Sequence, residues 1–323
     1  MVIWPRSFVV ALALPITLGS FACSEDAGSA AASGGGGDGT GGVSAPGGGG
    51  AGGGELPTTF GGDRPVTLAV PDDYDPAVPA PLVILLHGYG ASGAAQNVYF
   101  GLGAEVTARG GLFAAPDGTV DQGDRRFWNA TDACCNFYGS TVDDSAYLRG
   151  LVDAIGESYS VDPKRVHFVG HSNGGFMSYR MACDHAAVVA SIVSLAGATF
   201  LDAADCAPSE PVHVLQIHGT DDDTIAYDGG ETLPMLTYPG AVATVEQWAT
   251  VGGCGLTPDT SAPALDLESG IAGAESTVSR YAAGCQPGGS AELWTIAGGG
   301  HIPSLSEGFA PAVVDFLFAH PKP

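Results

Sequence analysis

Apolar runs and helix-spaced apolar positions alternate along the chain from residue 56 onward. The segment Leu82–His87 opens with five consecutive large apolar residues, the pattern of a strand buried on both faces of a sheet. The segment Asp143–Ser158 instead places Leu148, Leu151 and Ile155 three or four residues apart, which predicts a helix with one apolar face. Strands that alternate with helices indicate an α/β fold with a mainly parallel sheet and helices on both faces.

The same criteria give the remaining elements, all within residues 56–323, which we expect to form a single domain. The other expected strands are Val66–Val70, Leu112–Ala115, Arg165–Val169, Val189–Ala196, Val212–His218 and Leu293–Ile296. The other expected helices are Ser92–Ala108, Asn173–Cys183, Val242–Val251 and Pro311–Ala319, the first with Ser92 as its N-cap.

One strand–helix junction carries a candidate nucleophile. Residues 170–174 read G-H-S-N-G and lie between the strand Arg165–Val169 and the helix that follows. A serine on such a sharp turn stands clear of the sheet, and the two flanking glycines avoid collisions with neighbouring backbone. The pattern predicts Ser172 as the nucleophile of an acyl-transfer reaction.

A serine hydroxyl needs a base, and the chain has eight histidines. His301 stands out because it follows the last strand and three consecutive glycines, just before the closing helix. His171 adjoins Ser172 on the same turn, so its ring should point elsewhere, while His167 and His213 lie within strands and are expected to be packed. We therefore expect His301 to be the base.

The base needs a carboxylate that orients its ring and stabilises its charged form. Three candidates, Asp221, Asp222 and Asp223, follow the strand Val212–His218, and Asp222 is favoured. A calcium site made from this run is the alternative, but its spacing is not that of an EF-hand loop. The chain order Ser, Asp, His is typical of α/β-hydrolases.

Two backbone N–H groups are expected to bind the oxyanion in this type of site. One belongs to Asn173, the residue after the nucleophile. The other is assigned to Tyr89, which follows the strand Leu82–His87.

The first residues of the chain resemble an export signal. Residues 1–22 contain one basic residue, Arg6, followed by the apolar run Phe8–Leu18 and then small residues. The apolar run is too short to span a bilayer as a helix of the mature chain. We expect this segment to be removed on export.

The segment that follows resembles a lipoprotein tether. Cys23 stands where bacterial lipoproteins carry the lipidated cysteine, although Ser20 replaces the leucine usual three residues earlier. Residues 24–55 hold 15 glycines in 32 positions. The segment has too few large apolar side chains to drive folding, so it should stay flexible. Residues 23–55 are therefore expected to be a lipidation site and a flexible linker; the alternative is ordinary secretion with Cys23 as a free thiol.

Six further cysteines suggest disulfides in an exported protein. Proximity along the chain favours the pairs Cys183–Cys206 and Cys254–Cys285, which leaves Cys134 and Cys135 as a vicinal pair or as free thiols. A zinc site would need paired C-x-x-C spacing, which the chain lacks.

Charge limits the partners of the protein. The 11 basic residues are outnumbered by 35 acidic ones, for a net charge of −24 at pH 7. Such a chain repels nucleic acid and anionic lipid, so we expect no nucleic-acid partner and membrane contact only through a lipid on Cys23. Neither a metal nor an organic cofactor is implied by the motifs.

Together the motifs resemble one esterase family, which includes polyhydroxybutyrate depolymerase-like lipoproteins and feruloyl esterases (carbohydrate esterase family one). The matching segments span nearly all of residues 56–323: L-L-H-G-Y-G at 85–90, F-W-N at 127–129, C-C at 134–135, V-D-D at 142–144, G-H-S-N-G at 170–174, H-G-T at 218–220, Y-D-G-G at 227–230 and G-G-G-H at 298–301. The family pattern His-Gly-Thr-x-Asp supports Asp222. The chain departs from the family at Ile302-Pro303, where Thr-Trp-Pro is common, and at Ala226, where proline is common.

The resemblance implies an exported serine esterase of the α/β-hydrolase fold, with residues 56–323 as its catalytic domain. Its substrate would be a hydroxyalkanoate ester or a feruloyl or acetyl ester of plant polysaccharide. Trp128 and Tyr227 are candidate substrate-binding aromatics, with a core position as the alternative for Trp128. Two other functions stay open: a serine peptidase on the same fold, and a surface-binding lipoprotein that has lost activity.

Overall fold

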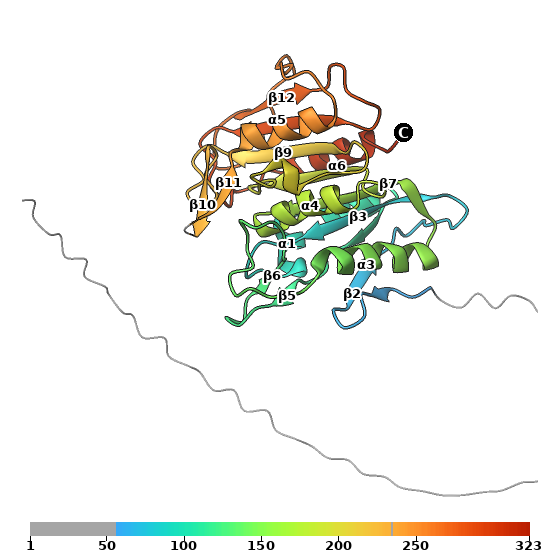
Figure 1. Cartoon of the computed structure of the whole chain (residues 1–323). Coiled ribbons are helices and arrows are strands. Elements are labelled where there is room, and N and C mark those ends of the chain that lie inside the picture. The colour runs from blue at the N-terminus through green and yellow to red at the C-terminus, as the bar shows by residue number, and fades with distance from the viewer. Residues whose placement is uncertain (1–55, 234) are drawn as a thin grey trace, which may run out of the picture. The chain divides into compact units, whose positions relative to one another are not determined.

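The computed structural model describes residues 56–233 and 235–323 (Figure 1). The expected signal segment 1–22, the lipidation site Cys23 and the linker to residue 55 lie outside the described residues. Within the described part of the chain, no helix has the length and apolar character needed to cross a membrane.

A nine-stranded sheet forms the centre of the described residues, with the strand order β1-β2-β4-β3-β7-β8-β9-β13-β12. The six strands from β4 to β13 in this order run parallel, whereas β1, β2 and β12 are antiparallel to their neighbours. The strands are β1 (Thr59–Phe60), β2 (Val66–Ala69), β3 (Ala80–Leu86), β4 (Leu112–Ala114), β7 (Val161–His171), β8 (Ser191–Leu195), β9 (His213–Gly219), β12 (Ser276–Tyr281) and β13 (Ser290–Ile296).

Two small antiparallel hairpins supplement this sheet. One joins β5 (Thr119–Val120) to β6 (Arg126–Phe127), and the other joins β10 (Gly229–Leu233) to β11 (Leu236–Pro239). Figure 1 shows both hairpins at the edge toward which the parallel strands point. In an open parallel sheet this edge is where sites form, so the hairpins belong to its surroundings.

Helices cover both faces of the sheet, as the alternating pattern predicts. One face carries α3 (Asp144–Ser158), α4 (Asn173–Asp184) and α5 (Ala241–Val251), whose apolar side chains share one core cluster. The other face carries α1 (Gly93–Phe100), α2 (Leu102–Ala108) and α6 (Phe309–Ala319), which share a second cluster. A 3₁₀ turn spans Ala203–Asp205.

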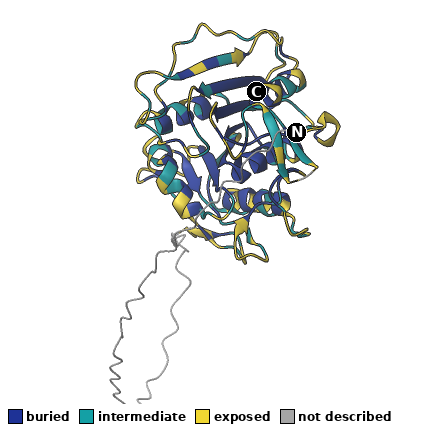
Figure 2. Ribbon diagram, turned by 90° about the vertical axis from the view of Figure 1, so that its left-hand side faces the viewer, coloured by how far each residue is buried: buried dark blue, intermediate teal, exposed yellow. Residues whose placement is uncertain are grey.

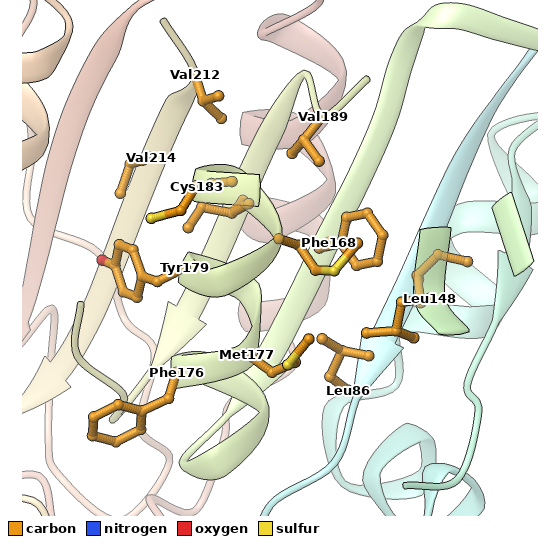
Figure 3. Close-up of a cluster of buried hydrophobic side chains, with 14 of the residues drawn as sticks. Leu86, Leu148, Phe168, Phe176, Met177, Tyr179, Cys183, Val189, Val212 and Val214 are labelled. Atoms are coloured by element: carbon orange, nitrogen blue, oxygen red, sulfur yellow. The ribbon is translucent and has the colours of Figure 1, made fainter. Parts of the chain in front are cut away.

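The apolar strands account for the depth of this core. Every residue of β3 and β8 is buried, which fits strands covered by helices on both sides (Figure 2). Figure 3 shows α4 lying across the sheet, with Phe176, Met177 and Tyr179 directed at neighbouring strands. The helix that follows Ser172 is thereby fixed against the sheet by packing along most of its length.

The prediction of a single helix over Ser92–Ala108 is wrong in one respect. Ser92 does cap the first helix, and its hydroxyl accepts a hydrogen bond from the Ala95 N–H at 3.2 Å. That helix ends at Gly101, whose φ of 68° lies in the left-handed region, and α2 starts immediately afterwards. Glycine tolerates this conformation without a steric penalty, so it divides a segment whose apolar spacing is otherwise continuous.

Three disulfides join the cysteines of residues 56–323. Cys183 pairs with Cys206 and Cys254 with Cys285, as proximity along the chain favours, and Cys134 pairs with Cys135. The first bond ties the end of α4 to the loop after β8. Chain crosslinks of this kind restrict the unfolded state and are typical of exported proteins.

Candidate active site

Ser172 occupies a strained turn between β7 and α4. Its φ of 54° and ψ of −120° are unusual for a residue with a side chain. A Cβ atom on Gly170 would lie 2.0 Å from the Gly174 carbonyl oxygen, and one on Gly174 would lie 2.2 Å from the Leu86 carbonyl oxygen. Only glycine fits at both positions, which is the local reason that the chain can turn this sharply around the serine.

The structure brings Ser172, His301 and Asp222 into one hydrogen-bonded line. The Nε2 atom of His301 lies 3.0 Å from the Ser172 hydroxyl oxygen, and its Nδ1 atom lies 2.8 Å from Oδ2 of Asp222. The side chain of Asp222 is fully buried, and that of His301 is 12% exposed. This arrangement can remove a proton from the serine while the carboxylate stabilises the resulting imidazolium.

Asp222 is the only one of the three adjacent aspartates that the described structure buries; Asp221 and Asp223 are exposed. Its Oδ1 atom accepts hydrogen bonds from the backbone N–H groups of Thr224 at 2.9 Å and Ile225 at 2.8 Å. Burial alone raises the pKa of this carboxyl, but hydrogen bonds from His218 and His301 outweigh it and hold the pKa well below its usual range. Asp222 therefore stays ionised wherever the protein is folded and active.

The loop after β3 passes directly beside the serine. A Cβ atom on Gly88 would lie 3.5 Å from the Ser172 Cβ, so the backbone that leads to Tyr89 is adjacent to the reacting hydroxyl. Among the described residues, no group takes up the backbone N–H of Tyr89 or of Asn173 in a hydrogen bond. Both donors are thus available to an oxyanion.

Trp128 connects the two segments that carry these donors. Its backbone N–H donates to the Asn173 side chain at 2.7 Å, and the Asn173 amide donates back to the Trp128 carbonyl at 2.9 Å. The Trp128 indole N–H donates to the His87 carbonyl at 3.1 Å. A role of Trp128 in substrate binding stays a prediction, and its side chain is fully buried, as the alternative of a core position expects. It belongs to the core, where it ties the turn after β7 to the loop after β3.

The other predicted aromatic, Tyr227, is partly buried against His218. Its hydroxyl is 2.8 Å from the Thr295 hydroxyl, and its ring meets the ring of His218 edge-on at 5.7 Å. Its role in substrate binding stays a prediction. The side chain of Tyr89 also has a fixed partner, because its hydroxyl donates to Asp121 at 2.5 Å.

His171 has a role that sequence reasoning missed. Its Nε2 atom lies 2.8 Å from the His301 carbonyl oxygen, and the two rings lie 5.0 Å apart. Burial, together with the nearby His301, lowers the pKa of His171 to about 4, so the ring is neutral at ordinary pH and donates this hydrogen bond. The ring thus holds the loop that carries His301, and its place next to Ser172 in the sequence was the available signal.

Exposed apolar side chains lie on the loops at this edge of the sheet. Met235 is 89% exposed on the β10–β11 hairpin, and Ile302 next to His301 is 69% exposed. The β10–β11 hairpin is anchored to the loop that carries the Cys134–Cys135 disulfide, because the Thr232 hydroxyl donates to the Ala133 carbonyl. Ile302 thus places an exposed apolar side chain next to the candidate base.

The fold and this arrangement define the class: the molecule is an α/β-hydrolase. The solved acetyl xylan esterase from Aspergillus awamori has the same fold, with a TM-score of 0.55 at 15% identity over 82% of this chain and 98% of that one. The chain belongs to the Esterase family, whose model is described as "Putative esterase" and matches residues 58–242. It is accordingly a carboxylic ester hydrolase.

Sequence relatives agree with this assignment. "Putative esterase NocK" from Nocardia uniformis subsp. tsuyamanensis is 29% identical over 252 residues, which cover 74% of this chain and 71% of that protein. Feruloyl esterase B from Piromyces equi is 28% identical over 246 residues, and the matched region covers 74% of this chain and 42% of that enzyme. The resemblance to feruloyl esterases is thereby confirmed; the lipoprotein form stays a prediction.

Proposed function

We propose that the protein is an exported serine esterase in which Ser172 is the nucleophile, His301 the general base and acid, and Asp222 the group that orients His301. The observation that carries this proposal is the line of hydrogen bonds from Ser172 through His301 to Asp222, at 3.0 and 2.8 Å. Among residues 56–323 as described, the backbone N–H groups of Tyr89 and Asn173 have no hydrogen-bond partner, and both belong to segments that adjoin Ser172. A packed structural cluster has no need of such donors.

The reaction follows from this geometry. Ser172 Oγ attacks the ester carbonyl carbon while His301 Nε2 takes the hydroxyl proton, and the backbone N–H groups of Tyr89 and Asn173 stabilise the oxyanion. The intermediate collapses, and His301 gives the proton to the departing alcohol, which leaves an acyl-enzyme on Ser172. Water, deprotonated by His301, then attacks the acyl carbon, and the acid and the free serine are released.

The substrate class is proposed as a feruloyl or acetyl ester carried by plant polysaccharide. The names of the feruloyl esterase relatives support it. A hydroxyalkanoate ester of the polyhydroxybutyrate type is the second candidate, and the exposed apolar residue Ile302, next to His301, favours an apolar chain of this kind. Both are neutral esters, which suits a protein of net charge −24.

Export is proposed from the N-terminal pattern and from the three disulfides, which persist in oxidising compartments. Lipidation at Cys23 would tether the enzyme to a membrane through residues 24–55. Globomycin, which blocks removal of lipoprotein signal segments, would cause the uncleaved form to accumulate if Cys23 is lipidated. Unchanged processing would show that the protein is secreted without a lipid.

The test of the catalytic proposal is hydrolysis of methyl ferulate, p-nitrophenyl acetate, p-nitrophenyl butyrate and soluble 3-hydroxybutyrate oligomers by the wild type and by Ser172→Ala. We expect activity in the wild type and a loss of about 10⁵- to 10⁶-fold in the variant. Ser261→Ala, which changes an exposed serine, is the matched control and should retain full activity.

The ranking of methyl ferulate against the oligomers decides between the two substrate classes. Equal rates for the wild type and Ser172→Ala would refute the assignment of the nucleophile. Hydrolysis of peptide amides in place of esters would favour the peptidase alternative, and a lack of hydrolysis of any substrate would favour the binding lipoprotein.

A further inference from the structure

A line of buried polar side chains leads from helix α4 through strand β9 to the candidate carboxylate. The Tyr179 hydroxyl on α4 donates to Oε1 of Gln216 at 2.8 Å, and Nε2 of Gln216 lies 3.0 Å from Nδ1 of His218. The three side chains are 0%, 0% and 1% exposed. Figure 3 shows the Tyr179 ring against the sheet beside Val214, which lies on β9 like Gln216. Nothing in the proposed reaction uses these groups directly.

The orientation of the Gln216 amide is fixed by its surroundings. Its Nε2 atom lies 2.8 Å from the Gly197 carbonyl oxygen, which can only accept, so a rotated amide would place two acceptors face to face. At the other end, burial raises the pKa of Tyr179 well above its ordinary value, so the hydroxyl keeps its proton and donates to Oε1. Gln216 therefore presents an N–H to His218.

This donor determines the tautomer of His218. Because Nδ1 accepts from Gln216, the ring proton is on Nε2. The Nε2 atom lies 2.8 Å from the Ile225 carbonyl oxygen and 3.3 Å from Oδ2 of Asp222. Both atoms are acceptors, so one N–H is shared between the loop backbone and the carboxylate.

Oδ2 of Asp222 thus faces two imidazole N–H groups. His301 approaches it at 2.8 Å and His218 at 3.3 Å, while Oδ1 is occupied by two backbone N–H groups. Every lone pair of the carboxylate that faces the protein has a donor, which prevents rotation of the carboxyl away from His301. Because His218 also donates to Oδ2, it reduces the negative charge with which Asp222 can stabilise protonated His301.

We infer that His218, held in one tautomer by Gln216, is a positioning residue that fixes the orientation of Asp222 and sets how strongly Asp222 supports protonated His301. This inference rests on the proposed function, because it assigns a role relative to the proposed triad. It extends that proposal to a second histidine, which does not touch the substrate.

The charge balance gives the sign of the expected effect. Besides Asp222, the ring of Tyr227 from the loop before β10 meets His218, and Tyr179 from α4 reaches it through Gln216. His171 interacts electrostatically with His218 and Asp222, and Tyr238 from β11 interacts with Asp222. The histidine that faces His301, His171, has its pKa lowered to about 4 by burial and by His301, so it is neutral over most of the assay range. Loss of the His218 N–H leaves more of the Asp222 charge for His301 and favours its protonated form. The acid limb of the kcat/KM profile should therefore move to higher pH.

The experiment compares His218→Leu with His218→Gln in the full-length enzyme, with p-nitrophenyl butyrate as substrate from pH 4.5 to 9. Leucine removes the donor, and we expect kcat/KM at the optimum to fall about ten- to hundredfold and the acid limb to move up by about half a pH unit. The amide nitrogen of glutamine can reach the place of Nε2, so His218→Gln should return the limb toward the wild-type position. A side chain that only filled space would change stability or rate without moving the limb.

Gln216→Leu supplies a second test, because it leaves His218 in place but frees its tautomer. We expect a shift of the acid limb in the same direction and of smaller size. Circular dichroism and the melting temperature identify which variants are folded. An acid limb at the wild-type pH in folded His218→Leu would overturn the inference, and if that variant does not fold, an unshifted limb in folded Gln216→Leu would do so.

Ser172→Ala separates this inference from the proposal that it extends. If Ser172→Ala retains activity, the triad itself is wrong. If Ser172→Ala is inactive and the acid limb of the His218 and Gln216 variants does not move, the triad stands and only the role of His218 is refuted.

Discussion

The two halves of the candidate site are held in place by different kinds of interaction. The half around Ser172 is built from backbone: a strained turn, glycines at which any side chain would collide, and two N–H groups. The half around Asp222 and His301 is built from side chains that meet through hydrogen bonds and come from segments far apart in the sequence. The first half should therefore tolerate no added volume, and the second should be sensitive to single polar atoms.

Within the half built from side chains, the largest effect is expected from a one-atom change. Asp222→Asn removes the negative charge and favours the wrong tautomer of His301, so we expect kcat to fall about 10⁴-fold with the fold intact. Asp221→Asn and Asp223→Asn are matched controls, because both side chains are exposed, and they should keep wild-type rates. A comparable loss in either control would mean that the wrong aspartate has been assigned. The measurement is kcat on p-nitrophenyl butyrate.

Gly170→Ala tests the half built from backbone by adding one methyl group. The new Cβ would lie 2.0 Å from a backbone oxygen, so the turn must shift, and we expect a destabilisation of about 3 kcal/mol or more and loss of activity. Gly150→Ala is the matched control, since nothing lies within 4 Å of its added Cβ on helix α3, and it should stabilise the protein by about 0.5–1 kcal/mol. Guanidinium unfolding measures both. Equal stability of the two variants would contradict the account.

Trp128→Phe tests the connection between the two oxyanion donors. The ring keeps most of its volume, but the hydrogen bond to the His87 carbonyl is lost and leaves a buried acceptor without its partner. We expect a loss of about 1–3 kcal/mol in unfolding free energy. We also expect kcat to fall more than KM rises, because the N–H groups act on the transition state. A change confined to KM would instead favour the predicted role of Trp128 in substrate binding.

The last effect concerns stability in acid, to which histidines inside and outside the site contribute. Burial and the neighbouring Arg165 lower the pKa of His167 to about 3, and burial lowers the pKa values of His171 and His213 to about 4. Each is neutral in the folded protein where the unfolded chain would bind a proton. Stability should therefore fall as the pH drops from 6.5 toward 4, by about 1.4 kcal/mol per pH unit for each histidine.

His167→Asn should reduce that slope by the contribution of one proton, as measured by guanidinium unfolding at several pH values. Gly150→Ala should leave the slope unchanged. Asp222 adds a loss of its own only below about pH 4, because its lowered pKa makes it bind its proton later than in the unfolded chain. A wild-type slope in His167→Asn would show that His167 is not held neutral.

The comparison also explains how much could be predicted from the sequence. The turn at Ser172 is a local pattern of five residues, and the alternating strands and helices locate it at the end of a strand. The carboxyl ends of parallel strands meet at one edge, so His301 and an aspartate from the run 221–223 could be expected there too.

The rest depends on three-dimensional packing that periodicity does not encode. The sequence places Trp128 in a loop, yet its side chain is fully buried. Its backbone forms hydrogen bonds with the Asn173 side chain, and its indole N–H donates to the His87 carbonyl. The sequence places His171 on the turn with Ser172 and His218 at the end of a strand, and only the folded chain shows their contacts with His301 and Asp222. Gly101 divides a helix whose apolar spacing is continuous, because its positive φ overrides the pattern.

The central claim is that Ser172 is activated by His301 and forms the acyl-enzyme. A p-nitrophenyl alkylphosphonate tests it most directly, because its phosphorus reacts as the ester carbon does and the adduct is stable. Mass spectrometry of the digested protein should find one adduct per molecule, on the peptide that contains Ser172, and none in His301→Ala at the same exposure. An adduct on another residue, or labelling of Ser172 that is equally fast in His301→Ala, would contradict the account.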